Sequence, residues 1–371
     1  MTEREAYVAF NLTEKIGAVG VAQLAAEAGG VAAAWERYPN RTARAGGDVD
    51  WRREFSLAKK FGVEIVTPAD PAYPPRLKDV PSHPLALYVK GDAAALAKPG
   101  VALVGTRRAT PYGLDQSFKI AEGLAEMGWS VVSGLALGID AEAHRGALAA
   151  LGTTVGVLGS ALDRFYPEEN RALAREIVQK GGAVVSEFPF GRDADQTTFP
   201  QRNRIVAALA QGVVAVEAPF KSGTLITTSI AADLGRTVMA VPGRVDSRSS
   251  QGCLALLRDG ARLVRSAADV DGELRALVPA QETRDAPPLK KKPRAAKLPR
   301  TSAADAPPSP AVSVEEAMIL RELDADGVTL DELVRRTKLP AAKVNALSLS
   351  LRLKARVRFF PGNRVALPRS P

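Results

Sequence analysis

The sequence predicts an α/β fold: an extended Rossmann-like parallel sheet core, with a small N-terminal helical domain and a C-terminal winged-helix domain. Two observations lead to this prediction. Between residues 101 and 241, short apolar runs of strand length alternate with helical patterns, which is typical of a parallel sheet covered on both faces. After residue 313, three helical patterns precede two strand patterns, which is the outline of a winged helix.

Length and composition limit the class of protein. A chain of 371 residues is too long for one ordinary core, so we expect several domains. Its single cysteine excludes an internal disulfide framework and favours the cytoplasm. With only two histidines besides, a His/Cys metal cage cannot be assembled. No apolar run approaches the ~20 residues of a membrane span, and we see no signal peptide.

The expected domains are a helical one similar to SAM or helix-hairpin-helix domains (1–75), the Rossmann-like one (76–281), a basic Pro/Ala-rich linker (282–312) and the winged helix (313–371).

Positive charge is concentrated in the last part of the chain. Residues 285–371 contain 17 Lys and Arg against 9 Asp and Glu, whereas the rest contains 33 against 32. A local excess of positive charge favours a polyanionic partner. On charge alone, a solvated basic tail without a partner explains the pattern equally well.

The N-terminal residues follow helical patterns up to residue 61, with a Gly-x-x-Gly motif at Gly17 and Gly20. Such a motif could touch a nucleic-acid phosphate, but it more often caps one helix and opens the next. Strand patterns at residues 63–67 and 85–90 flank a proline-rich connection and lead into the sheet.

Small and polar residues follow several of the predicted strands. The apolar runs are residues 101–104, 154–158, 183–185, 213–216 and 237–241. Ligands of parallel sheets bind at the carboxyl ends of the strands. Here that edge carries Gly105-Thr106-Arg107, Ser133-Gly134, Gly159-Ser160 and the stretch 217–224. Small residues let backbone N–H groups approach an anion, so the sequence predicts a phosphate-binding edge.

The predicted helices between these strands are residues 111–127, 140–151, 168–180 and 205–211, and residues 187–199 form a long loop. Asp140 and His144 lie four residues apart on one of them, a spacing that can hold a metal. The alternative, which needs no third ligand, is a helix N-terminal aspartate and a buried, hydrogen-bonded histidine.

Two arginines flank an asparagine at the start of the last of these helices. Arg202, Asn203 and Arg204 could form a phosphate clamp supported by the helix dipole, although arginine pairs also occur as surface ion pairs. Residues 221–224 (Lys-Ser-Gly-Thr) open a further helix with the same chemistry.

The tail contains helical patterns at residues 314–323, 329–337 and 340–353 and two strand patterns around Pro361-Gly362-Asn363. In winged helices the third helix often enters the DNA major groove, whereas many other members bind proteins. Basic residues cluster at its end, and they slightly favour nucleic acid. These are Lys343, Arg352, Lys354, Arg356 and Arg358.

Seven motifs occur in a fixed order across roughly residues 73–270. They are VGTRRAT (104–110), SGLALGIDAEAH (133–144), YPEEN (166–170), SEFPFG (186–191), FPQRNRIV (199–206), VVAVEAPFKSGTLIT (213–227) and GRTVMAVPG (235–243). In this order they resemble the DprA (Smf) family, the DNA-processing proteins of bacterial natural transformation.

The resemblance implies a cytoplasmic, homodimeric, non-enzymatic protein without a cofactor. It would bind single-stranded DNA, protect it from nucleases and load RecA recombinase against single-strand-binding protein. The DNA-binding residues implied are Gly105, Thr106, Arg107, Ser133, Gly134, Asn170, Arg202, Asn203, Arg204, Lys221, Ser222, Gly223 and Thr224.

Two features qualify the expected groove. Some family members carry lysines where this chain has Glu168-Glu169 and Gln196-Thr197-Thr198, so fewer cations are expected to line it. Sequence-neutral binding of a single strand needs stacking platforms as well as backbone contacts. Aromatic residues make up only 5% of the chain, and Phe199 and Tyr166 are the candidates, although either could equally be a core residue.

The rival interpretation is an enzyme. Nucleotide phosphoribohydrolases of the LOG type share the Rossmann-like fold, and Glu217 with Gly223-Thr224 could be a degenerate version of their site, but their Pro-Gly-Gly-x-Gly-Thr loop is missing. A dinucleotide-dependent oxidoreductase is excluded because no Gly-x-Gly-x-x-Gly follows the first strand.

Overall fold

The computed structural model describes residues 1–13, 16–38, 49–275, 313–323, 327–354, 356–360 and 363–367. The chain divides into two compact units, one of residues 1–107 and 116–283 and one of residues 108–115 and 284–371. The first unit therefore combines the predicted domains 1–75 and 76–281. The predicted linker at 282–312 lies outside the described residues.

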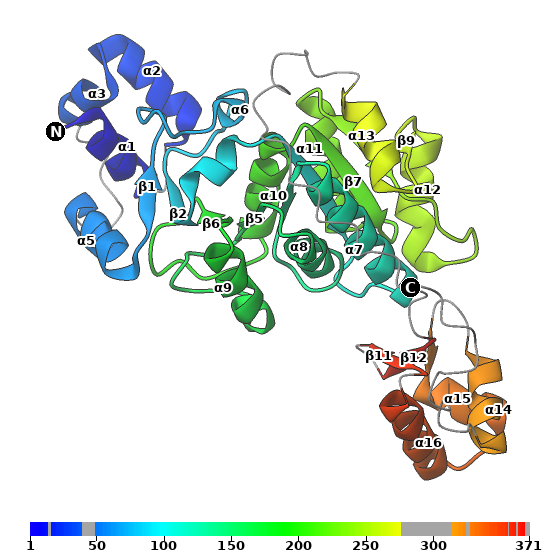
Figure 1. Ribbon diagram of the computed structural model, residues 1–371. Coiled ribbons are helices and arrows are strands. Elements are labelled where there is room, and N and C mark those ends of the chain that lie inside the picture. Colours follow the sequence, from blue (N-terminus) through cyan, green and yellow to red (C-terminus); the bar gives the residue numbers. More distant parts are fainter. Residues whose placement is uncertain are drawn as a thin grey trace, which may run out of the picture. The chain divides into compact units, whose positions relative to one another are not determined.

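A nine-stranded sheet forms the centre of the first unit (Figure 1). Its strand order is β1-β2-β6-β5-β4-β3-β7-β8-β9. Neighbours from β6 to β9 are parallel, whereas β2 is antiparallel to β6 and β1 to β2. The strands are β1 (Glu64–Val66), β2 (Leu87–Gly91), β3 (Gly100–Gly105), β4 (Ser130–Ser133), β5 (Thr154–Val157), β6 (Ala183–Ser186), β7 (Gly212–Glu217), β8 (Thr237–Ala240) and β9 (Arg262–Leu263). The predicted parallel sheet is thus confirmed, with an antiparallel pair added at one edge.

Helices cover both faces of this sheet because its strands are apolar on both sides. Successive residues of a strand point to opposite faces. Val184 belongs to a core cluster with residues of α8 (Ile139–Ala149) and α9 (Arg171–Gln179), whereas Val185 belongs to a different cluster with residues of α10 (Thr198–Leu209) and α11 (Gly223–Asp233). The other helical segments near the sheet are α6 (Pro75–Lys78), η1 (Ala93–Ala97), α7 (Pro111–Glu126), η2 (Glu168–Asn170), η3 (Arg248–Ser250), α12 (Gln251–Arg258) and α13 (Ala267–Arg275).

The N-terminal helices form their own core beside strands β1 and β2. They are α1 (Glu3–Asn11), α2 (Ala18–Ala28), α3 (Val31–Arg37) and α5 (Trp51–Phe61). Gly17 is the N-cap of α2, so the Gly-x-x-Gly motif opens a helix, as the second interpretation held. The Glu3 carboxylate accepts hydrogen bonds from the N–H groups of Val31 and Ala32, both at 3.0 Å, and thereby satisfies the first turn of α3.

The helix α10 begins earlier than the sequence pattern predicts. We expected residues 187–199 to be a loop and the helix to start at residue 205, but the structure starts it at Thr198. The Asp195 carboxylate accepts hydrogen bonds from the N–H groups of Thr197 and Thr198 at 2.7 and 3.0 Å. Pro200 lies in the first turn, where no N–H donor is required. Arg202 and Arg204 are therefore helical residues that point in the directions the helix dictates.

The second unit has the winged-helix fold that the sequence predicts. Its helices are α14 (Val314–Glu322), α15 (Leu330–Thr337) and α16 (Ala341–Leu353). Strands β10 (Val328–Thr329), β12 (Arg364–Ala366) and β11 (Arg358–Phe360) pair in that order. Thr329 caps the start of α15, since its hydroxyl accepts a hydrogen bond from the N–H of Glu332 at 3.2 Å.

Within the described residues, no single helix is long and apolar enough to cross a membrane. Only α2 and α3 taken together reach that length and composition, and they are bent by 86°.

Candidate nucleic-acid interface

The carboxyl ends of β3 and β7 lie next to each other, at the point where the strand order of the sheet reverses. From β3 the chain continues to β4, β5 and β6 on one side, whereas from β7 it continues to β8 and β9 on the other. In doubly wound sheets the ligand crevice lies outside the strand ends at this switch point. Arg107 follows β3, and the turn at Lys221 follows β7. The topology thus brings together two stretches that the sequence predicts to bind phosphate.

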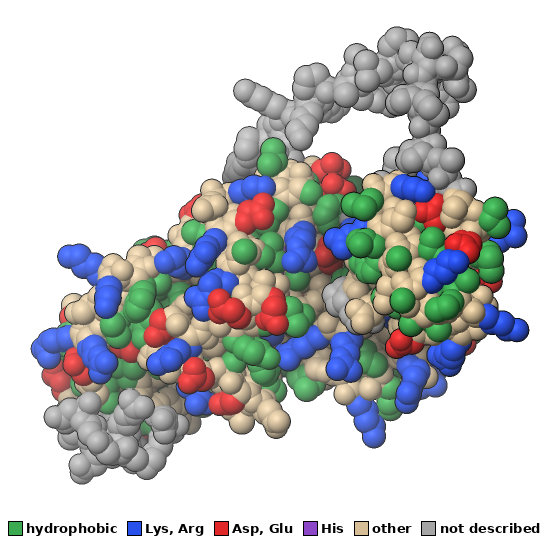
Figure 2. Space-filling model, turned by 90° about the horizontal axis from the view of Figure 1, so that it is seen from below, with side chains coloured by type: hydrophobic (Ala, Val, Ile, Leu, Met, Phe, Trp, Pro, Cys, Tyr) green, Lys and Arg blue, Asp and Glu red, His purple; other side chains and the backbone are tan. Residues whose placement is uncertain are grey.

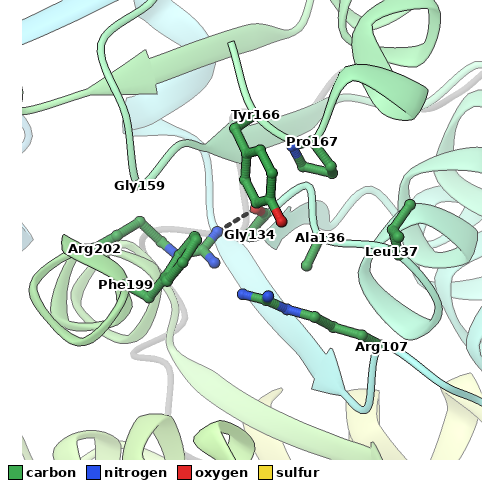
Figure 3. A pocket seen from close by; sticks show the side chains of 9 residues that line it. All are labelled: Arg107, Gly134, Ala136, Leu137, Gly159, Tyr166, Pro167, Phe199 and Arg202. Atoms are coloured by element: carbon green, nitrogen blue, oxygen red, sulfur yellow. Dashed lines mark hydrogen bonds between the residues drawn. The ribbon is translucent and has the colours of Figure 1, made fainter. Parts of the chain in front are cut away.

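A small recess lies at this edge and is built around two aromatic rings. The guanidinium carbon of Arg107 lies 4.6 Å from the centroid of the Phe199 ring. The Phe199 and Tyr166 rings are 6.0 Å apart and inclined by 49°, and Tyr166 is 49% exposed. Figure 3 shows these three side chains pointing toward one another. The recess is lined by Arg107, Gly134, Ala136, Leu137, Gly159, Tyr166, Pro167, Phe199 and Arg202.

This arrangement suits a nucleotide with an unpaired base. Exposed aromatic rings let bases stack without regard to their identity, and an arginine beside them can neutralise a phosphate. No ion pair joins Arg107 to an acidic residue in the part of the chain that the structure describes. Phe199 and Tyr166, for which the sequence left a core role open, are both partly exposed.

The loop between β4 and α8 forms one wall of the recess. Two of its N–H groups donate to a buried carboxylate of the protein. The N–H groups of Gly134 and Ala136 donate to Oδ2 of Asp140 at 3.1 and 3.4 Å. Thr106, at the neighbouring strand end, donates its N–H to the carbonyl of Glu217 at 2.7 Å. In this structure the N–H groups of Thr106 and Gly134 therefore already have intramolecular acceptors, and contact of these residues with phosphate stays a prediction.

The carbonyl groups of the same loop are held by two buried side chains. The Asn170 amide donates to the carbonyls of Leu135 and Ala136 at 2.8 and 3.1 Å. Arg202 donates through Nη1 to the carbonyl of Gly134 (Figure 3). It also donates to the carbonyl of Val157 at 2.7 Å. Both side chains are buried, so they support the loop from beneath. This differs from the direct DNA contacts predicted for them.

The loop has a tight conformation. Leu135 has a φ of 52°, a left-handed value that is uncommon for a residue with a side chain. A side chain at Gly134 would overlap the Arg202 guanidinium, and one at Gly138 would overlap the carbonyl of Thr106. The two glycines therefore let the loop approach its neighbours closely. The Ser133 hydroxyl is also buried and donates to the carbonyl of Leu103 at 2.6 Å.

Asp140 and Arg202 are opposite charges buried beneath the recess. Burial raises the pKa of Asp140, while Arg202 and the loop N–H groups favour its charged form. Burial lowers the pKa of Arg202 to about 10; Asp140 opposes this shift and Arg107 adds to it. Each charge is thus stabilised chiefly by the other, since water does not reach them.

The two arginines of the predicted clamp do not point to a common site. Arg204 pairs with Glu187, whose pKa is raised by burial, whereas Arg202 bonds the loop carbonyls. Two positions apart on a helix, side chains point about 200° apart. Asn203, between them, is partly exposed. The bidentate clamp is therefore not formed in this structure.

The start of α11 offers the other part of the predicted edge. Lys221 is exposed and has a left-handed φ of 60°, Ser222 is the N-cap and Thr224 is buried. The first N–H groups of a helix lack intrahelical partners and attract anions. Phe220, directly before this turn, is 60% exposed. The sequence interpretation missed it, although an aromatic residue beside Lys-Ser-Gly-Thr was a usable signal.

The question about Asp140 and His144 is settled in favour of the buried histidine. His144 Nδ1 lies 2.7 Å from the Thr154 hydroxyl, which itself donates to the carbonyl of Val131. The hydroxyl must accept from His144, because its one proton is already used. Burial lowers the pKa of His144 to about 3, so the ring is neutral. Over the described residues, no group of three or more His, Cys, Asp or Glu could hold a metal ion.

The basic cluster of the winged helix is partly neutralised. Lys343 pairs with Glu315, and Lys354 pairs with the buried carboxylate of Glu316 at 2.7 Å. Arg352 lies over the Phe359 ring at 5.4 Å. On the face of the molecule shown in Figure 2, Lys and Arg side chains are spread out with Asp and Glu side chains between them.

Comparisons with known proteins agree with the family resemblance. The family model described as DNA recombination-mediator protein A matches residues 64–275, and the DprA winged helix domain model matches residues 303–363. The protein Smf of Synechocystis sp. is 42% identical over 207 residues, which make up 55% of this chain and 52% of that protein. The match thus spans about half the length of this relative.

Two solved structures are similar to the chain. The crystal structure of DNA processing protein A (DprA) from Streptococcus pneumoniae has a TM-score of 0.63 and 33% identity, and covers 74% of this chain and 98% of that one. The DNA processing protein A of Helicobacter pylori, whose structure is described as giving insights into a single-stranded DNA binding mode, has a TM-score of 0.53 and 30% identity, and covers 58% and 98%. The model match over more than half of the chain shows that it belongs to the DNA recombination-mediator protein A (DprA) family.

Proposed function

We propose that this protein binds single-stranded DNA along the carboxyl edge of its sheet and catalyses no reaction on it. The observation that supports this most directly is the recess in which Arg107 stacks on Phe199 beside Tyr166. One base would stack on an exposed ring there, with its phosphate at Arg107. Lys221 and the first N–H groups of α11 would hold a neighbouring phosphate.

The contacts divide into direct ones and supporting ones. Arg107, Tyr166, Lys221 and Gly223, which are exposed, would touch the strand, as would Phe199, whose ring lies beside Arg107 in the recess. The other predicted residues are buried or only partly exposed and would support the edge, and Gly105 and Asn203 are two of the partly exposed ones. The supporting residues are Thr106, Ser133, Gly134, Asn170, Arg202, Arg204, Ser222 and Thr224.

In the cell, we propose the role that the family resemblance implies. The protein would act in the cytoplasm as a homodimer in natural transformation, protect incoming DNA and load RecA against single-strand-binding protein. The relatives in Streptococcus pneumoniae and Helicobacter pylori are named DNA processing proteins, which supports a role in handling DNA.

The binding proposal is tested by titrating labelled oligonucleotides at several salt concentrations. We expect single strands to bind more tightly than duplexes, with log K falling by about 0.7 per neutralised phosphate per decade of salt. A chain ending at residue 283, checked for folding by its melting temperature, should retain this preference. If all binding disappears with the tail while the fold is intact, the sheet edge is not the DNA site.

Two further measurements address the rest of the proposal. Nucleoside monophosphates incubated with the protein should remain uncleaved, since the Glu217 carboxylate accepts a hydrogen bond from Ser249 at 2.6 Å and is buried. Release of ribose 5-phosphate would favour the phosphoribohydrolase alternative.

For the proposed loading of RecA, the protein should shorten the lag of RecA filament growth on DNA coated with single-strand-binding protein. An unchanged lag would contradict this part of the proposal.

A further inference from the structure

The loop between β4 and α8, one strand away from the switch point, has the features of a phosphate-binding loop. It follows a central parallel strand, contains Gly134 and Gly138, and leads into the N-terminus of α8. In doubly wound sheets such a loop places its N–H groups around an anion, and the helix dipole favours the negative charge.

In this protein a carboxylate of the chain itself occupies the anion position. Oδ2 of Asp140 accepts the N–H groups of both Gly134 and Ala136 at 3.1 and 3.4 Å. Asp140 is only 6% exposed and lies in the first turn of α8. One oxygen atom thus receives two loop N–H groups, as a phosphate oxygen does in a binding loop.

A buried cation completes the anion site. Arg202 is 5% exposed and donates a hydrogen bond to the carbonyl of Gly134. The N–H of the same glycine donates to Asp140. A side chain at Gly134 would meet both the Arg202 guanidinium and Oδ2 of Asp140. Two N–H groups therefore donate to a carboxylate in the first turn of α8, and the nearby positive charge of Arg202 favours its charged form.

We propose that Asp140 is an internal substitute for phosphate, and that it sets specificity by keeping the phosphate groups of free nucleotides out of this loop. The ligand is thereby directed to the recess above the loop, where exposed rings and Arg107 can accept a nucleotide within a strand. This goes beyond DNA binding, because it concerns a site that DNA would not enter.

The loop should keep its shape without Asp140. Asn170 holds the carbonyls of Leu135 and Ala136, and Arg202 holds that of Gly134, so three carbonyl contacts remain in an Asp140→Ala variant. The N–H groups of Gly134 and Ala136 would then lack their acceptor, and the charge of Arg202 would lose its buried counter-charge. Together they would form an empty anion site.

The test is whether inorganic phosphate rescues the full-length Asp140→Ala variant. We expect this variant to melt below the wild type, and phosphate at about ten times its Kd to raise its melting temperature by about 3–6 °C relative to sodium chloride of equal ionic strength. Calorimetric titration should give one phosphate per chain for the variant and no measurable heat for the wild type. AMP in place of phosphate asks whether the freed site accepts a nucleotide as well.

Glu187→Ala is the matched control. It also removes a buried carboxylate from an arginine, Arg204, but it frees no loop N–H group. If phosphate stabilises Asp140→Ala no more than the wild type or Glu187→Ala, the proposal is overturned. If Asp140→Ala does not fold in buffer alone, its refolding yield and that of Asp140→Ser are measured at increasing phosphate concentration. A yield that rises with phosphate but not with chloride supports the proposal. Equal yields in phosphate and in chloride overturn it. No DNA is involved, so the result is independent of the proposed function.

Discussion

The recess at the sheet edge and the third helix of the winged-helix unit were both predicted to be nucleic-acid surfaces, but they present different chemistry. In the recess, Arg107 stacks on a partly exposed Phe199 and belongs to no ion pair with the described acidic residues. On α16, Lys343 is paired with Glu315, while Leu349 and Leu353 are 53% and 83% exposed. A count of basic residues therefore overstates the charge available to a partner, because ion pairs within the protein neutralise part of it.

The largest effect should come from removing the aromatic platform. Replacing Phe199 by Ala removes base stacking that is typically worth about 1–3 kcal/mol, so the Kd for single-stranded DNA should rise roughly 5- to 150-fold. The measurement is fluorescence anisotropy with a labelled oligonucleotide. Phe199→Leu keeps the volume but not the ring and should show most of the loss. Equal affinity of the wild type and both variants would remove this ring from the site.

One positive charge can be removed from each of the two regions by substitution with alanine. Arg107→Ala should raise the Kd about tenfold and make the salt slope shallower by ~0.7, because one phosphate contact is lost. Lys343→Ala, in which a lysine already paired with Glu315 is removed, should change the Kd by less than about twofold. Melting temperatures should stay close to that of the wild type in both. If Lys343→Ala has the larger effect, the difference drawn between the regions is wrong.

A smaller effect is expected at the start of α11. Lys221 is exposed, and a single exposed lysine is a flexible point charge. Lys221→Ala should weaken binding about two- to fivefold, with the same shallower salt slope as Arg107→Ala and no change in the preference for single strands. Lys221→Arg keeps the charge, so its affinity should equal that of the wild type. A weaker affinity of this variant would indicate that the left-handed backbone at residue 221, and not the charge alone, matters for binding.

The smallest effect on binding, but a distinct one on stability, is expected from Glu316 in the winged-helix unit. Hydrogen bonds from Lys354 and from the Ser313 N–H lower its pKa from 4.5 to about 2. Since the folded state has the lower pKa, the stabilisation is complete above pH 4.5 and is lost as the pH falls toward 2. Methyl NMR signals of the winged-helix core should therefore broaden or shift over this range, and Glu316→Gln should abolish that dependence without changing the affinity for DNA.

Much of the fold could be predicted from the sequence because its signals are local. Apolar runs such as residues 213–216 form strands in any environment that buries them, and the capping residue Thr329 specifies where α15 begins. The start of α10 was misplaced because the hydrogen bonds that the Asp195 carboxylate accepts from Thr197 and Thr198, and the tolerance of Pro200 in a first turn, outweigh the missing periodicity. The antiparallel position of β1 and β2 depends on pairing with β6, about 95 residues along the chain.

The class of fold, the family resemblance and the edge of the sheet at which Arg107, Phe199 and Lys221 would lie all follow from the sequence. Which of the polar groups at this edge are exposed depends on contacts that form only in the folded protein. Arg202 and Asn170 look like DNA contacts in the motifs, yet they are buried against the carbonyls of a loop, and Asp140 uses the N–H groups that a phosphate would need. The physical reason is that a polar group bonds whatever buried partner folding brings to it, and the sequence does not state which partner that is.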